Sequence, residues 1–217
     1  MRLLIVNPNT SQATNARIRA VAAPLVRACD DLEVLSAPSG IELIESVAQS
    51  MATIPAVLSV VDERHREVDA IIIAAFSDPG LSQARRAASC PVFGISESAM
   101  KMAARMADRF AIVTLGAALR GAIEANAAAY GFAEHLTGVR ILPWTVTTVS
   151  ADPPTYRKAF AEACAQAVAE DGAGAVIIGG GPLSGIADAI AEELPVPVLD
   201  GVRCAVEMAL ASGSGAA

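Results

Sequence analysis

The chain has 217 residues, of which 53% are hydrophobic and 18% are charged, so the composition predicts a compact, ordered protein with a substantial core. The formal net charge is −7. An acidic balance argues against nucleic acid and against an anionic membrane surface as partners, because both attract Lys and Arg.

Short apolar runs alternate with longer segments of helical character along the chain. Continuous runs of β-branched residues favour strands buried on both faces, and their alternation with helices is typical of a parallel sheet. We expect strands at about Leu3–Val6, Leu32–Leu35, Ile71–Ala75, Val92–Ile95, Arg109–Val113, Val139–Leu142 and Val176–Ile178. We expect helices at about Gln12–Ala28, Glu45–His65, Leu81–Ala88, Met100–Met106, Ala117–Tyr130 and Asp152–Ala169, and a last one after Asp200.

One strand–loop–helix–strand unit occurs twice. Ala70–Gly94 contains an apolar run, the turn Phe76–Gly80, a helix and a second apolar run, and Ala175–Asp200 repeats this order. Arg2–Val6 resembles Arg109–Val113 at nearly the same offset. Two matches at one offset favour an internal duplication over the general likeness of all such units. The sequence therefore predicts an α/β fold of two pseudo-symmetric Rossmann-like lobes with parallel-rich sheets and an inter-lobe cleft.

The same repeat suggests domain limits. We expect the first lobe to cover residues 1–95 and the second lobe residues 96–200. The helix at residues 201–213 is predicted to return to the first lobe, and residues 214–217 to form a flexible tail.

Several kinds of site have little support in the sequence. The four cysteines are scattered without a C-x-x-C pair, and the first apolar run is too short for a signal peptide, so we expect reduced thiols in a cytoplasmic protein. His65 is predicted at a solvated helix end and His135 on the surface. Neither histidine has the spacing to other ligands that zinc sites require, so we expect no metal site. No dinucleotide or phosphate-loop fingerprint is present.

Five short motifs together resemble the aspartate/glutamate/hydantoin racemase superfamily, most closely its hydantoin and allantoin racemase branch. The resemblance covers nearly the whole chain. The motifs are Asn7–Ser11, Phe76–Leu81, Gly94–Glu97, Val113–Thr114 and Val196–Asp200.

The resemblance implies two α/β lobes, a homo-oligomer, no cofactor, and one cysteine per lobe on either side of the substrate's stereocentre. One thiolate removes the acidic α-proton and the other thiol returns a proton to the opposite face, which requires two groups of matched pKa. In this sequence the matching positions hold Ala75 and Gly180, and neither residue transfers a proton.

Three explanations for these two positions stay open. The chain is a natural branch of the family that lacks cysteines at these two positions and has altered chemistry, a binding protein that has lost catalysis, or a variant with its nucleophiles replaced. The native character of the loop Gly179–Pro182 favours the first. The preferred hypothesis is thus a cofactor-independent enzyme acting at the carbon α to a carbonyl of a small carboxylate or cyclic imide. The alternatives are a non-catalytic binding protein and a decarboxylase or hydrolase relative.

Ser77 and Asp78 are the candidate catalytic residues, because they lie where the first thiol would point. Asp78 is a candidate general base, although a cap for the helix beginning near Pro79 is the simpler interpretation. Glu97 is similarly expected as a first-turn helix carboxylate. Ser184 is expected to cap a helix or bind a ligand, and Cys204 to be a buried small residue.

The candidate binding residues lie at strand ends, where side chains and free backbone N–H groups can cradle a carboxylate or an imide ring. The expected ligand is a small anionic or cyclic-imide molecule. The set comprises Asn7, Ser39, Gly40, Ala75, Phe76, Thr114, Gly180 and Gly181.

Overall fold

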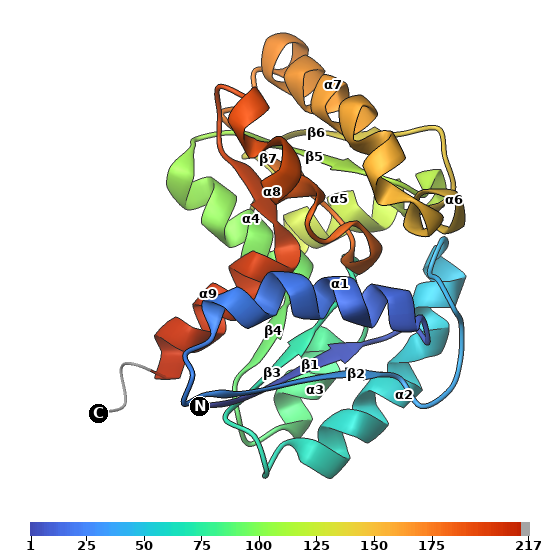
Figure 1. The fold of residues 1–217 in the computed structure, drawn as a ribbon, viewed down its shortest axis with the longest axis vertical. Helices are drawn as coiled ribbons and strands as arrows, with labels where there is room; N and C mark the ends of the chain where they lie inside the picture. Colours follow the sequence, from blue (N-terminus) through green and yellow to red (C-terminus); the bar gives the residue numbers. More distant parts are fainter. Residues whose placement is uncertain (214–217) are drawn as a thin grey trace.

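The computed structural model describes residues 1–213, which form two four-stranded parallel sheets flanked by helices (Figure 1). The predicted α/β architecture with two similar lobes is confirmed. The predicted tail at residues 214–217 lies outside the described residues.

The first sheet has the order β2-β1-β3-β4 and lies in the lower half of Figure 1. Its elements are β1 (Arg2–Asn7), α1 (Gln12–Ala22), the 3-10 turn η1 (Ala23–Leu25), β2 (Asp31–Ser36), α2 (Val47–Arg64), β3 (Ala70–Ile73), α3 (Leu81–Ala87) and β4 (Val92–Gly94).

The second sheet has the corresponding order β6-β5-β7-β8 and lies in the upper half. The elements from here to the last helix are α4 (Ile95–Met106), β5 (Phe110–Thr114), η2 (Ala117–Leu119), α5 (Arg120–Ala129), β6 (Leu136–Ile141), α6 (Val146–Ala151), α7 (Pro153–Asp171), β7 (Ala175–Ile178), η3 (Gly181–Leu183), α8 (Ile186–Ile190), η4 (Ala191–Glu193), β8 (Val198–Asp200) and α9 (Gly201–Gly213).

Strand register reproduces the internal repeat. Val6 pairs with Ile73 at the end of β1 and β3, and Val113 pairs with Ile178 at the same place in the second sheet. The two central strand pairs are thus equivalent, as the sequence repeat predicted.

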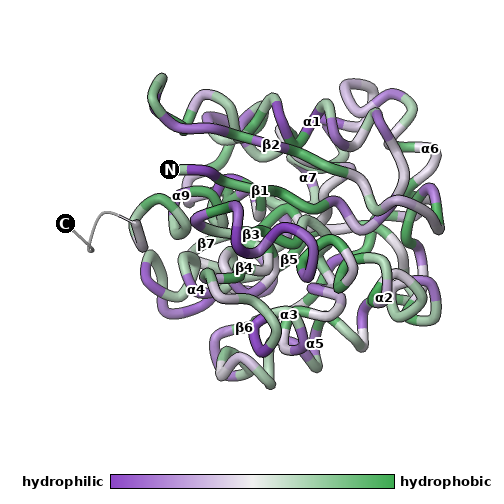
Figure 2. Tube along the Cα trace, turned by 90° about the horizontal axis from the view of Figure 1, so that it is seen from below, coloured by the Kyte–Doolittle hydropathy of each residue, from purple (hydrophilic) through white to green (hydrophobic). Residues whose placement is uncertain are grey.

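The central strands β1, β3, β5 and β7 are almost wholly buried, because both faces of each sheet are covered by helices. Figure 2 shows β1 and β3 as hydrophobic along most of their length. One apolar cluster contains residues of both sheets, among them Ile5, Ile72, Phe110 and Ile177. The two lobes therefore share a core. Helix α9 contacts α1, β3 and β4 of the first lobe as well as α4.

Several local features differ from the sequence expectations, among them helices α1 and α6 and the burial of His65. Helix α1 ends at Ala22 rather than near Ala28, because Pro24 lies in the 3-10 turn that follows and supplies no backbone N–H. Helix α6 was not predicted. His65 is buried rather than solvated, since its Nδ1 atom lies 3.0 Å from the backbone nitrogen of Ser89.

Two glycines of the loop after β7 lie directly against the loop after β3. A Cβ atom on Gly179 would meet the Phe76 ring at 2.8 Å, and one on Gly181 would meet the Ala74 carbonyl oxygen at 2.7 Å. Real Cβ atoms do not approach other atoms this closely, so the lobes meet here only because these positions lack side chains.

We predict that Gly181→Ala lowers the free energy of unfolding by about 1 to 3 kcal/mol, because the added methyl group meets backbone that has no rotamer to yield. Gly121→Ala is the matched control: nothing lies within 4 Å of its Cβ position in α5, and alanine there should stabilise the helix by about 0.5 to 1 kcal/mol. Urea unfolding of both variants measures the effects. Equal midpoints for the two would contradict the close contact.

Candidate functional site

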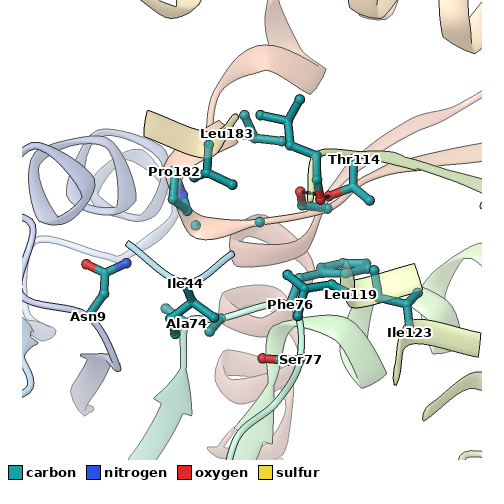
Figure 3. A pocket seen from close by; sticks show the side chains of 16 residues that line it. Asn9, Ile44, Ala74, Phe76, Ser77, Thr114, Leu119, Ile123, Pro182 and Leu183 are labelled. Carbon is teal, nitrogen blue, oxygen red and sulfur yellow. Dashed lines mark hydrogen bonds between the residues drawn. The ribbon is translucent and has the colours of Figure 1, made fainter. Parts of the chain in front are cut away.

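A cavity lies between the carboxyl ends of the two sheets. Its walls come from the loops after β1 and β3 of the first lobe and after β5 and β7 of the second. In each sheet these loops flank the point where the strand order reverses, which is where open parallel sheets place their ligands. Figure 3 shows Thr114, Pro182 and Leu183 facing Ala74, Phe76 and Ser77 across the space.

The cavity is small, about 50 Å³, and its lining carries no ionisable side chain within the described part of the chain. Three polar side chains reach it, those of Asn9, Ser77 and Thr114. The remaining lining is apolar or glycine: Ile44, Ala74, Ala75, Phe76, Leu115, Leu119, Ile123, Val146, Gly179, Gly180, Gly181, Pro182 and Leu183. No cysteine of residues 1–213 is among them.

The loop after β1 is held by its own asparagines. The Asn7 amide donates to Asn9 Oδ1 at 2.8 Å and to Asn15 Oδ1 at 2.9 Å, and Ser11 N donates to Asn9 Oδ1 at 2.9 Å. Asn7 is fully buried and does not line the cavity, although it was predicted as a binding residue. These bonds occupy its side-chain amide. They also fix Asn9, whose amide nitrogen lies on the cavity side in Figure 3. Asn9 is therefore the residue of this loop that can donate to a ligand.

Ser77 is positioned from both lobes. Its hydroxyl lies 2.6 Å from the Ser50 hydroxyl of α2, and its carbonyl accepts from the Asn126 amide of α5 at 3.1 Å. The backbone N–H groups of Phe76, Ser77, Gly180 and Gly181 have no hydrogen-bond partner among residues 1–213. Unpaired N–H groups beside a cavity are available to carbonyl or carboxylate oxygens of a ligand.

Thr114 and Gly180 complete the opposite wall. The Thr114 hydroxyl donates to the Gly179 carbonyl at 2.8 Å, which fixes the start of the glycine loop. Gly180 has φ +122°, a conformation that side-chain-bearing residues rarely adopt. A cysteine at residue 180 would therefore be strained unless the loop changed shape.

Asp78 lies behind the cavity wall and does not line it. Its buried carboxylate accepts from the backbone nitrogens of Ser96 at 3.1 Å and Glu97 at 2.9 Å, and from the Tyr130 hydroxyl at 2.9 Å. It thus caps α4, rather than the helix after Pro79, whose N-cap is Gly80. Burial raises the pKa of the Asp78 carboxyl to about 7, against the three hydrogen bonds, which lower it.

Two further predicted binding residues lie away from the cavity. Ser39 and Gly40 are exposed, because the chain after β2 turns outward before it reaches the cavity with Ile44. Glu97 lies in the first turn of α4 and pairs with Arg85. Ser184 is buried without a hydrogen bond for its hydroxyl, and Cys204 is buried, as predicted.

The structure thus brings six predicted residues to one cavity, namely Ala75, Phe76, Ser77, Thr114, Gly180 and Gly181. A ligand-binding role for these six stays a prediction. Asn9 was not predicted as a binding residue, although it belongs to the same Asn-Pro-Asn loop as Asn7. Ile44 and Val146 were not predicted either, because they come from segments without any recognisable motif.

The family model described as Asp/Glu/Hydantoin racemase matches residues 3–209. The chain belongs to this family. Racemase-family membership agrees with the resemblance stated from the sequence motifs.

Individual members of the racemase family support the assignment. A hydantoin racemase from Pseudomonas sp. (strain NS671) is 32% identical over 210 residues, covering 96% of this chain and 84% of its own length. An allantoin racemase structure from Klebsiella pneumoniae superposes with a TM-score of 0.94 at 32% identity, covering 99% of this chain and 88% of that one. The allantoin racemase from Pseudomonas fluorescens gives 0.93 at 26% identity, covering 99% and 91%.

Residues 1–213 contain no group of three or more His, Cys, Asp or Glu side chains placed to hold a metal ion. None of their helices is long and apolar enough to cross a membrane.

The raised pKa of Asp78 predicts a specific pH dependence of stability. The unfolded chain loses this proton near pH 4 and the folded chain near pH 7. Between these values the folded state holds more protons, so this carboxyl makes stability fall as pH rises, and its contribution levels off above pH 7.

Asp78→Asn should remove that slope. The difference in free energy of unfolding between wild type and variant is expected to change by up to about 1.4 kcal/mol per pH unit between pH 5 and 7. Urea unfolding at four pH values measures it. Asp62→Asn, at an exposed position on α2, is the control for the loss of one carboxylate. Parallel profiles for wild type and Asp78→Asn would contradict the assigned titration.

Proposed function

We propose that the cavity binds a small cyclic imide or a related compound with a carbonyl-activated α-carbon, and that the chain is not a two-thiol racemase. The observation that carries this proposal is the lining itself. It offers free backbone N–H groups on both walls but, among residues 1–213, no ionisable side chain.

The neutral lining favours an uncharged ring over a free carboxylate. No Lys or Arg among residues 1–213 lines the cavity, so a ligand anion would have only backbone and amide dipoles to replace its hydration. An imide ring carries carbonyl oxygens that the free N–H groups of the two loops can bind without that cost. The names of the hydantoin and allantoin racemase relatives point to the same class of ring.

Racemisation by the family's thiol pair requires a group on each face of the α-carbon. The motif resemblance assigns these positions to Ala75 and Gly180, and both residues line the cavity. Each well-placed acid–base group contributes roughly a hundredfold to ten-thousandfold. Without both, binding without racemisation is the expected behaviour.

One-sided chemistry is the second candidate, favoured by the arrangement of Ser77. Loss of CO₂ from a substituted malonate needs no base to begin. The C–C bond to the carboxylate breaks, its electron pair forms an enolate, and a proton from water completes the product. The free N–H groups beside Ser77 would stabilise the enolate oxygen. Asp78 can act here only indirectly, since its carboxylate faces α4.

We further propose that the protein acts in the cytoplasm, which rests on its scattered cysteines, and, from the resemblance, that the reaction or binding requires no cofactor and that the chain forms a homo-oligomer. The last is measured directly by light scattering of the purified chain.

The central test uses 5-substituted hydantoins and a substituted malonate in heavy water. We expect a thermal shift with the hydantoins and no deuterium at their α-carbon beyond the spontaneous rate, read by NMR. Deuterium exchange or enantiomer interconversion at an enzymatic rate would overturn the binding proposal. Release of CO₂ from the malonate would establish the second candidate, and no shift with any compound would contradict both.

A thiol variant tests the role of the two positions. Ala75→Cys should introduce measurable α-deuteration of a bound hydantoin, because it supplies one proton-transfer group. Adding Gly180→Cys should give little further gain, since φ +122° disfavours a side chain there. Ala74→Cys, at a neighbouring lining residue, is the matched control. Exchange equal to wild type in the Ala75→Cys variant would contradict the assignment of this position.

A further inference from the structure

Two segments from opposite lobes cover the cavity. The strap, residues 37–46 between β2 and α2, brings Ile44 into the lining. Helix α6 brings Val146 to the same lining from the second lobe. Both side chains are buried, at 9% and 7% exposure, although both segments lie at the surface of their lobes.

The strap and α6 are joined by Glu45. One carboxylate oxygen, Oε1, accepts from the Thr147 backbone nitrogen at 3.0 Å and from the Thr147 hydroxyl at 3.2 Å. Thr145 caps the same helix by accepting from Thr148 N at 3.0 Å, and Glu45 pairs a second backbone N–H of its first turn, that of Thr147. The Glu45 backbone is placed in turn by Gln49, whose side-chain oxygen accepts from Glu45 N at 2.8 Å.

Each segment has a second anchor within the body of the protein. Arg17 of α1 donates to the Ser150 hydroxyl at 3.0 Å and to its carbonyl at 2.5 Å, which fixes the far end of α6. Thr10 N donates to the Ile41 carbonyl at 3.0 Å, which fixes the strap near its middle. These contacts are partly buried or backbone-to-backbone, whereas the Glu45–Thr147 contact is exposed to water. Of these side-chain connections, Glu45–Thr147 is therefore the one most open to competition from water.

The cavity as it stands is too small for a substituted imide ring. A water molecule needs roughly 10 to 15 Å³ measured in the same way, so 50 Å³ holds only a few waters. A ligand with a ring and a substituent enters only if part of the lining moves. The covering residues Ile44 and Val146 stand on the two segments joined by the exposed contact.

We propose that the strap and α6 form a gate over the cavity, and that the hydrogen bonds from Thr147 to Glu45 hold it closed. The physiological meaning of this gate rests on the proposed binding function, but the opening itself does not. Breaking the contact frees the strap to lift Ile44 while Arg17 still retains α6.

The test measures access to the cavity without any ligand. Ala75→Cys places a thiol in the lining, and its alkylation by iodoacetamide is followed by mass spectrometry of the peptide containing residue 75. Exposed Cys29 and buried Cys164 serve as internal references for fast and slow alkylation. Glu45→Ala in this background should raise the alkylation rate at residue 75 about five- to tenfold, the effect of losing about one ordinary hydrogen bond, because this charged contact is exposed to water. Glu42→Ala is the matched control, because Glu42 lies on the exposed side of the same strap.

Hydrogen–deuterium exchange of the chain without the added cysteine gives an independent reading. Glu45→Ala should speed exchange in residues 41–46 and 146–149 and leave β1 and β5 unchanged, whereas Glu42→Ala should match wild type. Unchanged alkylation and exchange in Glu45→Ala would overturn the gate, as would equal increases in both variants. Since neither measurement uses a ligand, a failed gate and a failed binding proposal give different results.

Discussion

The buried carboxylates of Asp78 and Asp200 hold the loops of this fold in place. Asp78 follows β3 and accepts from the first turn of α4. Asp200 ends β8 and accepts from the first turn of α9 and from Gly185 N in the loop after β7. In both lobes one carboxylate thus joins the loop after the third strand to the helix after the fourth. Burial raises the pKa of each carboxyl, and the backbone donors oppose that shift. These two connections help to fix the loops after β3 and β7, which form part of the cavity wall.

Most of the fold could be predicted because its central strands carry an unambiguous signal. Runs such as Ile71–Ile73 and Val176–Ile178 are β-branched and uninterrupted, and parallel strands buried on both faces need that composition. The bounds of edge strand β6 were predicted less well: it covers Leu136–Ile141 rather than Val139–Leu142. An edge strand is only half covered, which weakens its sequence signal, and the pairing of β6 with β5 shifts in register between Phe110 and Ala111. Helix α6 was missed because its β-branched sequence has low helix propensity, and Arg17 and Glu45 hold it from another lobe.

The candidate site was predictable where it depends on strand ends and unpredictable where it depends on side-chain direction. Loops after parallel strands must gather at one edge, which brought Phe76, Thr114 and Gly180 together. Which of two asparagines faces the cavity was decided by a hydrogen-bond network that no spacing reveals. The Asp78 side chain points away from the cavity because its backbone adopts φ +46°. Its carboxylate fits beside α4 only because residue 94 is glycine: a Cβ atom there would lie 2.4 Å from the Asp78 carboxyl carbon.

The contact between Phe76 and Gly179 couples two positions more than a hundred residues apart in the sequence. The ring occupies the space that any side chain at residue 179 would need. Substitutions at the two positions therefore cannot be sampled independently: a larger residue at 179 is tolerated only in a chain that already has a smaller one at 76. A library built to reshape this cavity has to vary the pair jointly, because each single change on the path leaves either a collision or a void.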